Sequence, residues 1–186
     1  MRPIACLSVV GVLVLGLATP LDAQNRGGVM GEIIRDVEGL EVRIMGLAKA
    51  MPASAYEWRP GEGVRSTAEV FIHLAGDNYF MPVLMGGTAP PETGIDIGRR
   101  RDSLVAFEQR TMTRDQIIVE LEKSFRFLKE AMHDTTDASL EAQPKFERRQ
   151  MSTRAFWMAT AGHLHEHLGQ LIAYARSNDV RPPWSK

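Results

Sequence analysis

Apolar residues recur every three or four positions along the segment that follows residue 28. The positions are Val29, Ile33, Val37, Leu40, Ile44, Leu47 and Met51. Because an α-helix turns once in about 3.6 residues, these side chains share one face and can be buried together. The spacing therefore predicts a long helix, and Pro52 ends it because proline does not continue a helix interior.

A second helix is predicted to begin at Ser66. Glu69 stands three residues later, and this pairing of serine with glutamate is typical of a capping box at a helix start. The helix runs through His73 toward Met81. Pro82 is expected either to kink it or to end it.

Two more helices follow in the second half of the chain. Thr113 and Gln116 form a further capping-box pair, and Ser152 or Thr153 starts a last helix that runs to about Ser177. The third helix carries its own apolar stripe of Ile117, Leu121, Phe125, Leu128 and Met132.

The segments between the helices are polar or rich in glycine and proline. Residues 86–111 read as a long loop with a short extended or helical piece, and residues 134–150 as a polar connector. The signal for strands is weak throughout. Four long helices with polar connectors predict an all-α fold, a four-helix up-down bundle.

The N-terminal residues have a different character. Arg2 precedes an apolar run from Ile4 to Leu17, and small and polar residues follow it. This order is typical of a secretory signal peptide, here with cleavage after Ala23. The alternative is an uncleaved anchor, but the apolar run is shorter than the about 20 residues that span a bilayer core. The chain then divides into a signal peptide (1–23), a flexible segment (24–28) and a helical domain (29–186).

Charge and cysteine content narrow the classes of function. The 22 Lys and Arg residues nearly balance the 23 Asp and Glu residues, so nucleic acid is not an expected partner. The run Arg99–Arg101 is interpreted as a solvated loop rather than an anion-binding patch. The only cysteine, Cys6, lies in the predicted signal peptide. The exported domain, periplasmic or extracellular and without stable membrane insertion, would therefore bind any metal through nitrogen and oxygen ligands.

Candidate chemistry is concentrated in the last helix. His163 and His167 stand four positions apart, so their side chains lie one turn apart on one face. Two such imidazoles can bind one metal ion, although an exposed surface pair is the alternative. The pair is not a zinc-protease motif, because Leu164 stands where that motif has glutamate. His165 is expected to face solvent.

The second helix offers the remaining candidates. His73 lies on its inner face and is the natural third ligand, unless it is an ordinary core histidine. Asp77 follows one turn later and would also point inward, where an unpaired carboxylate is costly. Asp77 is therefore a fourth ligand, a hydrogen-bond acceptor from a ligating imidazole, or a catalytic base, unless it lies at a solvated mouth.

Other polar residues near the histidines have less specific signals. Gln170 and Tyr174 fall on the strip of His163 and are candidates to orient a substrate, with ordinary lining of an interhelical cleft as the alternative. Glu166 is turned away from the pair and reads as a solvated residue. His133 is most simply a favourable group at the end of the third helix.

These motifs together resemble a known family. The pattern His163-x-x-x-His167-x-Gly169-Gln170-Leu171 resembles the C-terminal signature of the DinB-like (DinB/YfiT-like) superfamily of metalloenzymes. The resemblance covers about residues 29–184. Its other elements are Trp58-Arg59-Pro60, Gly63-Val64-Arg65-Ser66, His73-Leu74 and the Pro182-Pro183 tail after Tyr174-Ala175-Arg176.

The resemblance implies a divalent metal ion held by His73, His163 and His167, with zinc as first choice and nickel or iron as alternatives. It also implies a homodimer and chemistry on low-molecular-weight thiols, which are scarce outside the cytoplasm. We therefore expect an exported metal-dependent hydrolase or transferase that acts on an unidentified small molecule. The alternatives are a non-enzymatic metal-binding or stress-associated bundle, and a bundle with no metal at all.

Overall fold

The computed structural model describes residues 27–144 and 151–185, and in these ranges the chain forms helices and no strand. The predicted signal peptide, including Cys6, and the first part of the predicted flexible segment lie outside the described residues. None of the described helices is both long enough and apolar enough to span a membrane.

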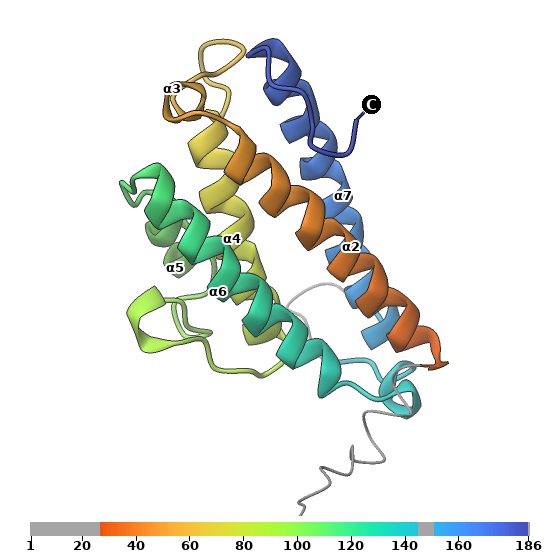
Figure 1. Ribbon diagram of the computed structural model, residues 1–186. Helices are drawn as coiled ribbons and strands as arrows, with labels where there is room; N and C mark the ends of the chain where they lie inside the picture. The colour runs from red at the N-terminus through yellow and green to blue at the C-terminus, as the bar shows by residue number, and fades with distance from the viewer. Residues whose placement is uncertain (1–26, 145–150, 186) are drawn as a thin grey trace, which may run out of the picture.

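The four predicted long helices are present (Figure 1). Both capping boxes form at the predicted residues, and Pro82 lies inside a helix that ends two residues later. The long helices are α2 (Val29–Ala50), α4 (Thr67–Leu84), α6 (Arg114–His133) and α7 (Thr153–Ser177). The shorter ones are α3 (Ala53–Tyr56), η1 (Pro91–Thr93), α5 (Arg100–Glu108) and η2 (Asp137–Ser139).

Each long helix packs against two others, since α4 contacts α6 and α7, and α2 contacts the same two helices. Arg114, at the start of α6, donates hydrogen bonds to the carbonyl oxygens of Lys49 and Met51 at the end of α2, at 2.7 and 3.0 Å. Asp137, just after α6, accepts from the first backbone N–H groups of α2 at 2.8 and 3.1 Å. These contacts satisfy orphan groups at both ends of α2 and show that α2 and α6 are antiparallel.

The directions of the helices correct one prediction. In Figure 1, α4 and α6 run the same way, so the strict alternation of an up-down bundle is not observed. The reason is the connection between them, which contains α5 packed along α4. Because α5 brings the chain back, α6 begins at the end of the molecule where α4 began. The segment predicted as mainly a loop thus holds a nine-residue helix that includes Arg100 and Arg101.

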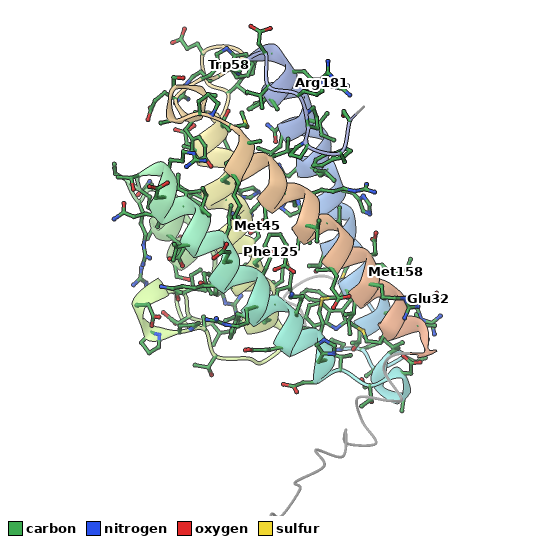
Figure 2. All side chains as sticks on the ribbon, in the orientation of Figure 1. Glu32, Met45, Trp58, Phe125, Met158 and Arg181 are labelled. Carbon is green, nitrogen blue, oxygen red and sulfur yellow. The ribbon has the colours of Figure 1, made fainter. Side chains whose placement is uncertain are left out.

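Helix α4 lies at the centre of the packing, and fourteen of its 18 residues are buried. Gly76 lets α5 approach closely, because a Cβ there would lie 2.8 Å from Leu104 Cδ1 and 3.1 Å from Phe107 Cδ1. Figure 2 shows how side chains such as Met45 and Phe125 fill the space between the long helices. The central position of α4 means that its polar residues must find partners inside the protein.

Candidate metal centre

The structure brings three of the five histidines together. His73 comes from α4, and His163 and His167 come from successive turns of α7. Each offers a ring nitrogen, and these atoms all lie within 4.8 Å of one another. The ring centroids of His163 and His167 are 4.4 Å apart, and His73 lies 4.8 Å from His167 and 5.2 Å from His163. The three residues form a group that can hold one metal ion.

Asp77 lies against the same group, one turn after His73. Its Oδ2 is 2.7 Å from Nε2 of His163 and 3.3 Å from Nε2 of His73. The Asp77 side chain is only 9% exposed, whereas that of His163 is 27% exposed. The carboxylate is thus directed inward, as expected, and His163 is the more exposed of the two residues.

Glu108, the last residue of α5, contacts the Nδ1 atom of the His73 ring. Its Oε1 lies 2.7 Å from Nδ1 of His73, and its Oε2 accepts from Nη2 of Arg65 at 3.1 Å. Burial alone would raise the pKa of Glu108, but the hydrogen bond and charge of His73, with the Arg65 guanidinium, hold that pKa below its usual range. An ionised carboxylate only accepts hydrogen bonds, so Nδ1 of His73 carries a proton and donates it to Glu108.

His167 is held by a second chain of hydrogen bonds. Its Nδ1 lies 2.7 Å from Oε1 of Gln170, Nε2 of Gln170 donates to the Tyr174 hydroxyl at 2.9 Å, and that hydroxyl donates to the Arg65 carbonyl at 3.2 Å. Because a carbonyl can only accept, the order of donors is fixed back to His167, whose Nδ1 must carry the proton. Burial lowers the pKa of His167, which favours the neutral imidazole that binds metals.

The atoms that face the centre of the group are imidazole nitrogens and a carboxylate oxygen. Nε2 of His73 and Oδ2 of Asp77 lie 3.3 Å apart. Nε2 of His163 is buried without a well-oriented hydrogen bond, although Asp77 Oδ2 is close to it. A buried carboxylate is unfavourable unless a cation or hydrogen-bond donors lie beside it, and a metal ion bound by the imidazoles would meet this need. The ligand atoms, three imidazole nitrogens and a carboxylate oxygen, fit a divalent metal ion such as zinc.

The remaining singled-out residues lie outside this group. His165 is half-exposed and pairs with Asp36 of α2, with 2.9 Å between Nε2 and Oδ2, so it faces away as predicted. Glu166 is exposed, and His133 is the last residue of α6. Gln170 and Tyr174 share the strip of the histidines as predicted, but their recorded contacts are with His167 and Arg65.

Sequence reasoning missed Glu108 and Arg65. Glu108 lies 35 positions from His73 in a stretch that reads as a loop, and no local pattern marks it. Both residues also line an open cleft of about 570 Å³ between the start of α4 and the end of α5. The cleft adjoins the histidine group through Glu108, while the three histidines themselves do not line it.

Solved structures with this fold include two DinB-like proteins and an isomerase. One from Bacillus subtilis aligns with a TM-score of 0.61 at 18% identity, over 81% of this chain and 93% of its own. One from Bacillus cereus aligns with a TM-score of 0.64 at 15% identity, over 84% and 97%. A mycothiol-dependent maleylpyruvate isomerase aligns with a TM-score of 0.59 at 13% identity, over 76% of this chain and 60% of the isomerase. The comparison with curated proteins found no match.

At these identities the structural likeness establishes the fold alone. The sequence itself matches the family model of the DinB superfamily over residues 38–171. This range includes the three histidines, Asp77 and Glu108, and it covers most of the described helices. The chain therefore belongs to the DinB superfamily.

Proposed function

We propose that the protein is an exported metalloenzyme in which His73, His163 and His167 hold one divalent metal ion. The observation that carries the proposal is the convergence of one ring nitrogen from each of the three histidines within 4.8 Å of the others, with Asp77 Oδ2 beside them. Imidazoles and a carboxylate gathered in this way are groups that one divalent ion can bind together. Zinc suits the donor set best, and nickel and iron are the alternatives.

A catalytic role is favoured because the histidines supply only three protein ligands. Three protein ligands leave a coordination position open, which distinguishes catalytic zinc sites from structural ones. The bound ion would polarise a substrate oxygen or activate water near neutral pH. In this proposal Asp77 takes a proton from a nucleophile beside the histidines, and a small substrate enters past His163, which is more exposed than Asp77. These features support a hydrolase or transferase.

The competing function is metal binding without catalysis. The contact of Asp77 with both His73 and His163 favours this candidate, because a carboxylate that served as fourth ligand would close the site. Asp77→Ala separates the two. In the enzyme it abolishes turnover and leaves most of the metal affinity, whereas in a closed binding site it lowers the affinity itself.

Export is part of the proposal and shapes the substrate class. The isomerase with a similar fold is mycothiol-dependent by name. An exported enzyme would meet few small thiols, so we propose chemistry that does not require one. Sequencing the N-terminus of the protein recovered from outside the cytoplasm tests export, and a start at Gln24 is expected. Assembly as a homodimer, which sedimentation would detect, is also proposed.

Metal content tests the central part of the proposal. The protein is purified without an affinity tag, and its metal is counted alongside that of His73→Ala. We expect about one divalent ion per wild-type chain, none in the variant, and a higher melting temperature of the wild type after zinc is added. If both proteins lack stoichiometric metal and neither zinc nor nickel changes the melting temperature, the proposal is wrong.

Activity is tested on a panel of ester, amide and thiol-conjugate substrates. Turnover by the wild type that disappears in His167→Ala supports an enzyme centred on the histidines. Turnover that survives the substitution excludes this centre as the active site.

A further inference from the structure

Arg65 occupies an unusual place in the turn that leads into α4. It does not belong to the histidine group, and its side chain is 44% exposed at the open cleft. The guanidinium of Arg65 nevertheless terminates the chain of hydrogen bonds that holds His73. Its backbone carbonyl terminates the chain that holds His167. No other described residue is recorded in both chains.

The first chain ends on the Arg65 side chain. Nη2 of Arg65 donates to Oε2 of Glu108 at 3.1 Å, and the other oxygen of Glu108 lies 2.7 Å from Nδ1 of His73. The carboxylate therefore sits between a guanidinium and an imidazole. Without the guanidinium it would lose one of its two recorded anchors and could turn away from the imidazole.

The second chain ends on the Arg65 backbone. The Tyr174 hydroxyl donates to the Arg65 carbonyl at 3.2 Å, and the indole ring of Trp58 packs edge-on against the Tyr174 ring at 5.0 Å. Arg59 donates to the carbonyl of Val64, the residue before Arg65, at 2.8 Å. The carbonyl is thus part of a braced turn, and it sets the direction of every donor back to His167.

We propose that Arg65 is a positioning residue for the metal centre, which couples the turn before α4 to two of the three metal-binding histidines. The inference rests on the proposed function, because it concerns how the histidines are held for the ion. Partners of a ligating imidazole fix its tautomer and ring orientation, and their loss typically lowers metal affinity by about 10–100-fold. Arg65 acts one step further out, so about a 10-fold loss is expected.

The direction of the change in metal affinity distinguishes a positioning role of Arg65 from an effect of its charge. Arg65 is a cation, and its removal would by simple electrostatics tighten the binding of a divalent cation by about twofold, given its exposure. Loss of positioning has the opposite effect and weakens binding. Arg65→Met keeps the aliphatic stem and removes both charge and donors, so the direction of the change identifies the mechanism.

The experiment measures the zinc affinity of the full exported chain by competition with a chromophoric chelator. Arg65→Met is expected to bind zinc about 10-fold more weakly than the wild type, and Arg65→Lys, which restores a donor to Glu108, to regain most of the loss. The visible spectrum of the cobalt-loaded protein should shift in Arg65→Met, because the ligand geometry changes. Tyr174→Phe cuts the second chain and should also weaken zinc binding.

Arg59→Met is the matched control. Arg59 lines the same cleft, is likewise 44% exposed and pairs with Glu69. It braces the turn through the Val64 carbonyl but contacts no member of the two histidine chains, so the variant controls for the fold of the turn. It should leave zinc affinity within about twofold of the wild type. Equal losses in Arg59→Met and Arg65→Met would overturn the inference by assigning the effect to the fold of the turn. So would unchanged or tighter binding by Arg65→Met, while a wild type that binds no zinc would instead refute the proposed function.

Discussion

Helix α4 makes two buried polar contacts that can be compared directly. On the side of α6, Asn78 Nδ2 donates to Ser124 Oγ at 3.1 Å, and Ser124 in turn donates to the carbonyl of Leu121 at 2.9 Å. On the side of α7, Oδ2 of Asp77 lies 3.3 Å from Nε2 of His73 and 2.7 Å from Nε2 of His163. Asp77 and Asn78 are neighbours in the sequence and are both buried.

The difference lies in whether every polar atom has a well-oriented hydrogen bond. The Asn78 contact is complete within the protein, and such a network holds two helices in register. In the Asp77 contact, Nε2 of His163 is buried without such a bond, and a cation held by the imidazoles and the carboxylate would complete it. Burial of polar residues alone therefore does not indicate a metal site. The completeness of the hydrogen bonding is what distinguishes the two contacts.

The largest expected effect is on the α7 side. His73→Ala removes a ligand and the contact between α4 and the pair on α7. Zinc affinity should fall by more than about 100-fold, because loss of a direct ligand exceeds the usual cost of losing its hydrogen-bond partner. Equilibrium dialysis against buffered zinc measures the change. Retention of wild-type affinity would contradict the assignment of His73.

Glu108→Gln weakens the support of His73 without removing a ligand. The amide can still accept a hydrogen bond, but it lacks the charge that strengthens the bond to Nδ1–H. We expect zinc affinity to fall by about 10-fold to 100-fold, measured by chelator competition. A change in melting temperature of the metal-free protein without a change in affinity would show that Glu108 serves only the fold.

Asn78→Ala tests the hydrogen bond between α4 and α6. It removes the donor to Ser124, whose buried hydroxyl keeps only its bond to the Leu121 carbonyl, and the free energy of unfolding should fall by about 1–3 kcal/mol. Zinc affinity should not change, since Asn78 has no recorded contact with the histidines. Urea unfolding and zinc competition on the same preparation test both halves. A large loss of zinc affinity would remove the distinction between the two contacts.

Asp77→Asn makes the α7 side resemble the α6 side. The amide adds an N–H donor and removes a buried negative charge, so the metal-free protein at pH 8 should be about 1 kcal/mol more stable than the wild type. Zinc should bind less tightly, because a negative charge beside the ion is lost. Thermal unfolding with and without zinc gives both quantities. A metal-free variant less stable than the wild type would argue that Asp77 is already satisfied.

The smallest effect is expected from His165→Ala. This histidine lies between two proposed ligands in the sequence, but it pairs with Asp36 on the surface. An exposed pair contributes at most about 1 kcal/mol, and zinc affinity should stay within about twofold. The same chelator assay used for His73→Ala serves here. A loss as large as in His73→Ala would mean that α7 presents a different face to the metal.

Much of the fold and part of the histidine group could be predicted from the spacing of residues alone. The capping boxes at Ser66 and Thr113 and the pair His163 and His167 depend on residues within one or two helical turns, and the structure has them where expected. The parallel course of α4 and α6 could not be predicted, because it depends on α5, whose sequence reads as a loop.

Glu108 and Arg65, which support the histidines, could not be predicted for a related reason. Glu108 reaches His73 because Gly76 lets α5 lie close to α4, and Arg65 meets Tyr174 across 109 positions of sequence. Such contacts are set by packing between distant segments, which leaves no periodic signal. The strip shared by His167, Gln170 and Tyr174 was visible in the sequence. The Arg65 carbonyl, which sets the direction of their hydrogen bonds, was not.

The position of zinc in a crystal of the zinc-loaded protein tests the central claim most directly. Anomalous scattering at the zinc edge should give one strong peak per chain, at about 2.0–2.1 Å from one nitrogen of each of His73, His163 and His167. The absence of a peak among these three residues, or a peak held instead by surface groups such as His165 and Asp36, would contradict the account.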